Sequence, residues 1–191
     1  MRKVDVKESR IVFDDFYKME EATFAYELPD GTMTEPLTRL CFHRGDGVAA
    51  AVYNTDTQRA FLVRQFRYPC YTHGEGWILE VVAGMLGEDE DAAEAMMREI
   101  EEEIGYKVAA IEPICHFYVS PGGTSERIFL FYAEVNEACK VSNGGGLDHE
   151  AENIEVIEMT LDELRDTLAR NGIPDGKSIM ACNYLLQKHT K

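Results

Sequence analysis

The chain has 191 residues, of which 45% are hydrophobic, and this suits one globular domain or one domain with a small extension. The formal net charge of −16 argues against a nucleic-acid-binding surface and against docking on anionic membranes, because both need clustered basic residues. The five cysteines include no CxxC pair, the N-terminus lacks the apolar stretch of a signal peptide and no apolar run could cross a bilayer, so we expect a cytoplasmic protein without zinc or disulfides.

The first half of the chain consists of apolar, β-branched segments separated by turn residues. Pro29-Asp30-Gly31 and the polar residues 54–57 are typical of turns between paired strands. A longer apolar segment before residue 84 is typical of a buried strand. The strands expected in this half cover residues 23–28, 34–42, 47–53, 60–65 and 77–83.

A helix is predicted to follow, because Met96, Ile100 and Ile104 are spaced by four residues and form one apolar face. Gly105 stands where a helix ends in a left-handed cap. Beyond it the sequence predicts strands near 108–117, 127–135 and 154–159, a helix opened by the capping box that starts at Thr160, and a last helix over about 177–188.

This alternation of strands and helices predicts the α/β class, with a mixed sheet packed between helices. Residues 45–191 are expected to form that domain. The strands within residues 1–44 are expected to form a small antiparallel β region, the only candidate subdomain.

The helix before Gly105 carries clustered acidic side chains. Glu99, Glu102 and Glu103 are three and four residues apart, so they project from one side, opposite the apolar face. Like charges at this spacing destabilise a helix by about 0.2–0.5 kcal/mol per pair, and only Arg98 is placed to compensate locally. Such a set of hard oxygen ligands suits Mg²⁺ or Mn²⁺, and the alternative is a solvated acidic face.

The residues around this cluster follow a strict pattern. The pattern begins with a glycine, five residues of any kind, Glu, seven residues of any kind and Arg-Glu. It continues with an aliphatic residue, any residue, Glu-Glu, any residue, Gly and a bulky apolar residue. The fixed positions are Gly84, Glu90, Arg98, Glu99, Ile100, Glu102, Glu103, Gly105 and Tyr106. So many positions at fixed gaps are rarely met by chance. The chain therefore resembles the Nudix hydrolase family, and this resemblance implies the family's α/β/α sandwich.

The resemblance also implies a metal site. Glu99 and Glu103 are expected to be the main ligands of Mg²⁺, or of Mn²⁺ in its place, with help from Glu102. The carbonyl group of Ala83, just before the first glycine of the motif, resembles the family's backbone ligand. Arg98 is expected to orient the glutamates. Bound metal would neutralise a pyrophosphate and make a bound water more acidic.

A glycine-rich acidic loop over residues 142–153 is the second catalytic candidate. Its three consecutive glycines are expected to let it move like a lid. In the family, a late acidic loop brings a glutamate to the metals or to the attacking water. Glu152 matches the metal-ligand position best, and Glu150 is the candidate general base. The alternative is a solvated loop without a catalytic role.

Several features point to the substrate. Ser120-Pro121-Gly122 resembles a feature of the ADP-ribose and nucleoside diphosphate sugar pyrophosphatases, although it is also good turn chemistry. Arg67 resembles the arginine that this subgroup directs at a substrate phosphate, where a planar fork suits paired oxygens. The further residues assigned to substrate binding, each with a structural or surface role as its alternative, are Phe16, Arg39, Met85, Glu126 and Lys177.

The glycines at 144–146 and Asp175-Gly176-Lys177 resemble the GDP-mannose pyrophosphatase branch, but Leu40 stands where that branch carries an acid. We therefore expect Mg²⁺-dependent hydrolysis of a nucleoside diphosphate sugar of the ADP-ribose or GDP-mannose type to a nucleoside monophosphate and a sugar phosphate. The alternatives are a non-catalytic ADP-ribose-binding regulator and a Nudix hydrolase of another nucleotide. Enzymes of the resembling subgroup are dimers, so we expect a homodimer in which residues 1–44 pack across the partner and help to bind the base.

Overall fold

The computed structural model describes residues 1–147 and 153–189, which form two compact units. The first unit comprises Met1–Asp46 together with Tyr118–Arg127. The second comprises Gly47–Phe117 and the described residues from Ile128 onward.

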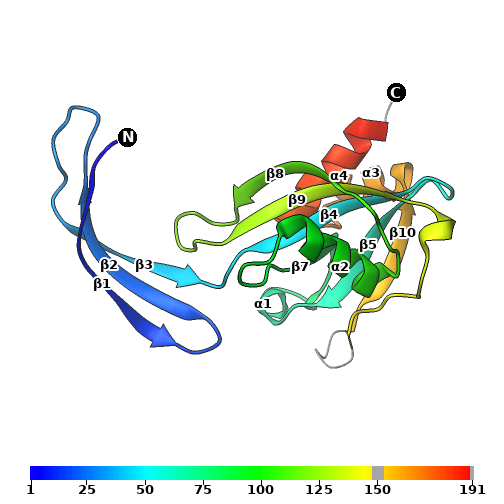
Figure 1. The fold of residues 1–191 in the computed structure, drawn as a ribbon, viewed down its shortest axis with the longest axis horizontal. Coiled ribbons are helices and arrows are strands. Elements are labelled where there is room, and N and C mark those ends of the chain that lie inside the picture. The colour runs from blue at the N-terminus through cyan, green and yellow to red at the C-terminus, as the bar shows by residue number, and fades with distance from the viewer. Residues whose placement is uncertain (148–152, 190–191) are drawn as a thin grey trace. The chain divides into compact units, whose positions relative to one another are not determined.

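The first unit contains a three-stranded antiparallel sheet in the order β1-β2-β3 (Figure 1, blue to cyan). Its strands are β1 (Val4–Asp14), β2 (Lys18–Tyr26) and β3 (Leu37–His43). The turn predicted at Pro29-Asp30-Gly31 lies in the β2–β3 connection, where the N–H of Gly31 donates to the carbonyl of Leu28 at 3.0 Å. The sequence did not reveal β1. Register shifts at Val6/Glu8 and Ile11/Phe13 break the two-residue alternation that marks a strand.

The loop before residue 127 belongs to this first unit because it is bonded to the end of β3. The N–H of Phe42 donates to the carbonyl of Gly123 at 2.8 Å, and the hydroxyl of Thr124 donates to the carbonyl of Phe42 at 2.9 Å. The Nδ1 atom of His43 lies 2.9 Å from the hydroxyl of Ser125. These bonds join residues about 80 positions apart, which no local pattern could predict.

The second unit is built on a seven-stranded sheet with β10-β5-β4-β9-β8 as its main order; β6 pairs with β5, and β7 pairs with β4. Strands β4 and β9 are parallel, whereas β5 is antiparallel to its neighbours β4, β6 and β10, so the predicted mixed sheet is confirmed. The strands are β4 (Gly47–Asn54), β5 (Arg59–Phe66), β6 (Trp77–Glu80), β7 (Val82–Met85), β8 (Glu112–Tyr118), β9 (Arg127–Val135) and β10 (Glu155–Thr160).

The single strand predicted over residues 77–83 is wrong, because the segment divides at Val81. Its first part, β6, runs along β5, and its second part, β7, runs along β4. A run of apolar residues indicates that a strand is buried, but it does not indicate which strand lies beside it. The sequence therefore could not show that the segment changes its pairing from β5 to β4. The division matters for function because Glu80, in β6, lies beside β5, whereas Ala83, in β7, lies beside β4.

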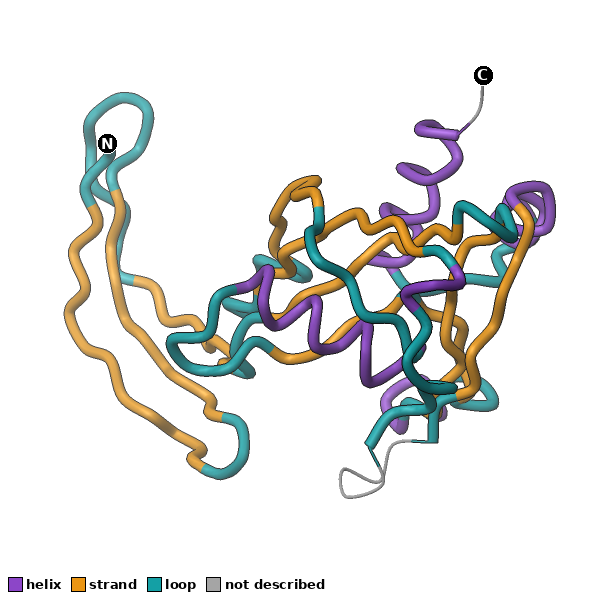
Figure 2. Tube along the Cα trace, turned by 45° about the vertical axis from the view of Figure 1, so that its right-hand side comes forward, coloured by secondary structure: helices purple, strands orange, loops and turns teal. Residues whose placement is uncertain are grey.

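Helices cover both faces of this sheet (Figure 2). They are α1 (Tyr68–Tyr71), α2 (Ala92–Ile104), α3 (Leu161–Ala169) and α4 (Gly176–His189), with a 3₁₀ turn at Glu137–Cys139. The short α1 and the 3₁₀ turn were not predicted, since they offer too few residues for a periodic pattern. In the described part of the chain, no helix is long and apolar enough to span a membrane.

The central strand β4 shows why the unit has three layers. All eight of its residues are buried, and successive side chains point to opposite faces. Val48, Ala50 and Val52 pack in one core cluster with residues of α2. Ala49 and Ala51 pack in the other cluster, which includes residues of α3 and α4. The predicted α/β/α sandwich is therefore confirmed.

The ends of α2 are set by two capping residues, of which the sequence predicted the second, Gly105. The carboxylate of Asp91 accepts the N–H groups of Ala93 and Glu94 at 2.9 and 3.1 Å, as an N-cap residue does. Gly105 ends the helix with a φ of +79°, the left-handed conformation that favours glycine.

Candidate active site

Two glutamates of α2 reach the backbone of β7. The carboxylate of Glu103 accepts the N–H of Ala83 at 3.3 Å. Glu99 packs so tightly on Gly84 that a Cβ atom added there would lie 2.0 Å from its carboxyl carbon. A side chain at residue 84 would therefore displace the Glu99 carboxylate from this position. Glycine at the first fixed position of the motif lets that carboxylate lie against the strand backbone.

Burial separates Glu103 from the other acids of the helix. The sequence predicted that Glu99, Glu102 and Glu103 all project away from the apolar face, but Glu103 is only 2% exposed. That expectation is wrong for this residue, because its carboxylate turns toward β7 and bonds to Ala83. A carboxylate in such surroundings requires hydrogen bonds or a cation.

Arg98 lies among the acids of the motif. One of its terminal nitrogens donates to Glu99 at 2.9 Å and to Glu102 at 3.0 Å, and its Nε donates to Glu90 at 3.3 Å. Burial would lower the pKa of Arg98, but the charge of Glu99 and the hydrogen bonds to Glu90 and Glu99 raise it. Glu90 also accepts the N–H of Gly87 at 2.9 Å, and this bond together with Arg98 lowers the pKa of Glu90. Arg98 thus holds the loop before α2 to the helix.

The donors at this junction fit a hard divalent cation. Glu99, Glu102 and Glu103 offer carboxylate oxygens from one helix, and Ala83 adds a backbone carbonyl, the ligand types that Mg²⁺ and Mn²⁺ prefer. Among residues 1–147 and 153–189, no three acidic, histidine or cysteine side chains already converge as a complete metal cage. Arg98 instead bridges Glu99 and Glu102. Each of those carboxylates bonds Arg98 through one oxygen, so metal ligation at this junction would fall to its second oxygen.

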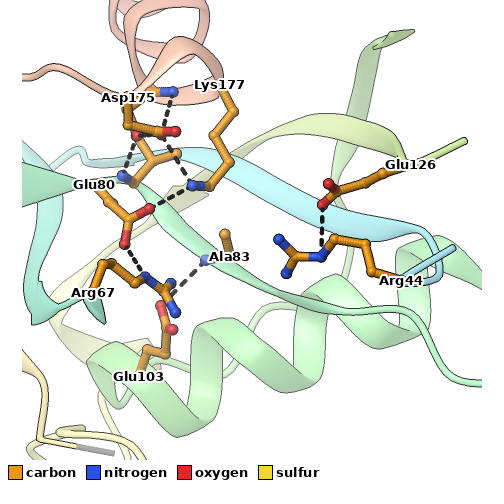
Figure 3. A network of polar contacts seen from close by, with 10 residues as sticks. Arg44, Arg67, Glu80, Ala83, Glu103, Glu126, Asp175 and Lys177 are labelled. Carbon is orange, nitrogen blue, oxygen red and sulfur yellow. Dashed lines mark hydrogen bonds and ion pairs between the residues drawn. The ribbon is translucent and has the colours of Figure 1, made fainter. Parts of the chain in front are cut away.

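A second polar network lies at the end of β6 (Figure 3). The buried carboxylate of Glu80 accepts the Nε–H of Arg67 at 2.8 Å on one oxygen and the ammonium of Lys177 at 2.6 Å on the other. Lys177 also pairs with Asp175 at 3.0 Å. Two residues assigned to substrate phosphates from the sequence, Arg67 and Lys177, thus share one carboxylate.

Glu80 is not among the residues that the sequence predicted for the site. A signal was present, because Glu80 is the only charged residue in the apolar segment between Trp77 and Ala83. A charge in a buried strand requires a partner of opposite charge. The identity of the partners could not be deduced, since they lie 13 and 97 positions away in the sequence.

The glycine-rich loop is tied to the C-terminal end of α2. The N–H of Gly145 donates to the carbonyl of Glu103 at 2.9 Å, and the N–H of Gly146 donates to that of Glu102 at 3.2 Å. Gly144 has a φ of +65°, and a Cβ atom there would lie 2.3 Å from the carbonyl oxygen of Glu103. Gly144 thus serves close contact with the helix, and the lid-like movement expected of the loop stays a prediction.

Between this loop and the helix lies an open cavity of about 520 Å³, lined in part by Arg98, Glu102 and Ser142. Glu150 and Glu152, the candidate base and loop ligand, lie outside the described residues. The cavity therefore adjoins both the acidic helix and the start of the segment that carries those two residues.

The remaining candidates occupy both units. Met85 is 44% exposed at the end of β7 in the second unit. In the first unit, Phe16 is 79% exposed in the turn between β1 and β2, so its alternative role as a core residue is wrong. Arg39 is exposed on β3, where it donates to the carbonyl of Thr38. Glu126, on the β8–β9 loop, pairs with Arg44 at 3.5 Å.

Comparisons with known proteins agree with this architecture. Residues 43–181 match the NUDIX domain family. The chain is 33% identical over 184 residues to a GDP-mannose pyrophosphatase of Cronobacter sakazakii, with 95% of this chain and 94% of that protein covered. It is 34% identical over 185 residues to the corresponding protein of Pectobacterium atrosepticum, with 96% and 94% covered. A crystal structure of an ADP compounds hydrolase superimposes with a TM-score of 0.72 at 17% identity, covering 97% of this chain and 93% of that one.

The fold is an α/β/α sandwich in which one acidic helix packs beside a strand of the sheet. The chain belongs to the Nudix hydrolase family, since the family match spans most of its length.

The contact between the loop and α2 makes Gly144 sensitive to substitution. Gly144→Ala should lower the free energy of unfolding by about 1–3 kcal/mol, because alanine is strained at this positive φ and its Cβ would displace the loop from the helix. Gly74→Ala is the control, since no atom lies within 4 Å of the added Cβ. Thermal and denaturant unfolding measure both variants. Equal stability of the two would contradict a tight fit at residue 144.

Proposed function

We propose that the protein hydrolyses the pyrophosphate bond of a nucleoside diphosphate sugar of the ADP-ribose or GDP-mannose type, to a nucleoside monophosphate and a sugar phosphate. The observation that carries this proposal is the junction of β7 and α2, where Glu99 and Glu103 meet the backbone at Ala83 and Gly84. The names of the relatives support the same substrate class.

The residues of the junction would have different roles in such a reaction. Glu99, Glu102, Glu103 and the carbonyl of Ala83 would hold Mg²⁺, or Mn²⁺ in its place. The bound ion would supply charge neutralisation for the pyrophosphate and a more acidic water. Arg98 keeps the acidic side chains in register through the bonds described above.

The residues outside the junction are proposed to hold the substrate. Arg67 would face a phosphate group, and Met85 would lie against the bound nucleotide. Lys177, also assigned to the substrate from the sequence, would act from behind Arg67, because its ammonium lies between Glu80 and Asp175. Glu126 would contact the substrate from the β8–β9 loop. Phe16 would stack on the base and Arg39 would bind beside it, both from the other subunit of a dimer.

A release assay with Mg²⁺ tests the function directly, using ADP-ribose, GDP-mannose, UDP-glucose and dinucleoside polyphosphates. We expect turnover of one or more of the nucleotide sugars. Glu103→Gln should reduce turnover by orders of magnitude while the protein stays folded, because glutamine keeps the shape and can still accept the N–H of Ala83. Glu94→Gln, on the exposed first turn of the same helix, is the control.

The assay also separates the alternatives. Tight binding of ADP-ribose without turnover would support the regulatory alternative. Turnover restricted to dinucleoside polyphosphates would support a hydrolase of another nucleotide. A folded Glu103→Gln protein with wild-type activity at saturating Mg²⁺ would contradict the ligand assignment.

Glu150 and Glu152 are proposed to divide proton transfer and metal binding. Glu150→Gln should lower kcat by about 10²–10⁴-fold with little change in KM or metal affinity, as loss of a general base does. Glu152→Gln should weaken metal binding, and high Mg²⁺ or Mn²⁺ should partly restore its activity. Kinetics measured across a metal titration distinguish the two. A nearly silent Glu150→Gln together with an unrescued Glu152→Gln would reverse the assignment, and two silent variants would place the base elsewhere.

A homodimer is proposed because the N-terminal sheet exposes apolar side chains to solvent. Val6, Ile11 and Phe13 of β1 are each about half exposed, at 59%, 47% and 57%. Three strands form a sheet of marginal stability unless one of its faces is covered. Sedimentation at micromolar concentration should show a dimer, and Ile11→Lys should weaken it, whereas the exposed Lys7→Ser should not. A fully active monomer would contradict the proposal.

A further inference from the structure

Glu80 is a buried carboxylate with a cation on each oxygen. Its side chain is 5% exposed, and its two oxygens accept from Arg67 at 2.8 Å and from Lys177 at 2.6 Å. Removing a carboxylate from water is costly unless charge and hydrogen bonds compensate, and here both oxygens are compensated. The position of Glu80 is therefore strongly constrained, and so is that of any group bonded to it.

Arg67 is held by one edge of its guanidinium only. Glu80 accepts from Nε, and within residues 1–147 and 153–189 the two terminal nitrogens make no hydrogen bond. The Arg67 side chain remains 41% exposed. A guanidinium fixed at Nε keeps its terminal N–H groups as a planar fork, which matches two oxygens of a phosphate.

The ammonium group of Lys177 is more enclosed than the guanidinium group of Arg67. It is only 15% exposed, and two carboxylates, those of Glu80 and Asp175, surround its ammonium group. Asp175 is itself fixed, because it accepts the N–H of Ser178 at 3.0 Å at the start of α4. The hydroxyl of Ser178 in turn accepts the N–H of Val81 at 2.9 Å, next to Glu80. These bonds connect the start of α4 to Val81, the chain neighbour of Glu80, so they help to hold Glu80 in place.

We propose that Glu80 is a positioning residue that acts through Arg67. It orients the arginine so that its terminal nitrogens meet a phosphate group of the nucleotide substrate, and Lys177 with Asp175 balances the charge of Glu80 and holds it in place. This inference rests on the proposed function. Glu80 itself touches neither the substrate nor the reacting atoms.

Substitution of Glu80 by glutamine should disturb this arrangement at nearly constant volume. An amide has one oxygen to accept with and one NH₂ group that cannot accept, so at most one of the two cations keeps its bond. We expect kcat/KM to fall about 10- to 100-fold, as is typical when a reacting group loses its supporting contacts. Glu112→Gln is the matched control, because Glu112 also bonds a lysine of α4, Lys188, at 2.7 Å.

A double-mutant cycle separates positioning from a general structural role. Glu80→Gln, Arg67→Ala and the double variant are compared by kcat/KM and by thermal unfolding. If Glu80 acts through Arg67, Glu80→Gln lowers activity in the wild type but adds almost nothing once Arg67 is absent. An equal loss in both backgrounds would overturn the inference. If Glu80→Gln does not fold, Glu80→Asp replaces it in the cycle, since it keeps the charge but withdraws the carboxylate by one methylene.

A further measurement does not depend on turnover. The Nε–Hε NMR resonance of Arg67, assigned by its loss in Arg67→Ala, should exchange slowly with solvent in the wild type and rapidly in Glu80→Gln. Binding of inorganic pyrophosphate should weaken in parallel. Should the wild type hydrolyse no nucleotide sugar, the proposed function fails, and these two readouts still decide the role of Glu80. An unchanged resonance together with unchanged pyrophosphate binding would overturn it.

Discussion

The close approach of α2 to β7 is the contact on which the arrangement of the site depends. It brings two acidic side chains of one helix to a strand backbone, and Gly84, which has no side chain, leaves room there for the carboxylate of Glu99. Electrostatics oppose such a cluster, since acids three and four residues apart repel. Burial of Glu103 increases that cost, and the Arg98 bridge reduces it without removing the negative charge. A helix held in this way is suited to receive a cation.

Hydrogen bonds fix both ends of α2. The N-cap at Asp91 and the brace between Glu90 and Arg98 set the start of α2. Its end is held by the glycine-rich loop, whose N–H groups bond to the last carbonyls of the helix. Helix ends carry carbonyl groups without partners inside the helix, so a loop that supplies N–H groups is stabilised by the contact. The segment carrying Glu150 and Glu152 therefore begins at a point anchored to the proposed metal ligands.

The Glu80 network is also a cluster of like charges held by one opposite charge, but there the clustered charges are positive. In the metal junction, carboxylates are concentrated and an arginine restrains them. At Glu80, two cations are concentrated and a buried carboxylate restrains them. Both networks belong to the second unit, and Val81 links them, because β6 ends at Glu80 and β7 starts at Val82. The change of strand partner at Val81 thus places the Glu80 side chain in one network and the Ala83 backbone in the other within a few residues.

The sequence by itself determined the class of the protein, because the motif from Gly84 to Tyr106 depends on fixed local spacing. It also determined α2 and its C-terminal cap at Gly105, the capping box at Thr160 and the central strands, since propensity and periodicity act over a few residues. Tertiary structure decided what depends on distant contacts. Among these are the burial of Glu103, the division at Val81, the attachment of the β8–β9 loop to β3, and the meeting of Arg67 and Lys177 on Glu80. Hydrogen bonds between residues 80 or more positions apart leave no periodic trace in the sequence, so only the folded chain reveals them.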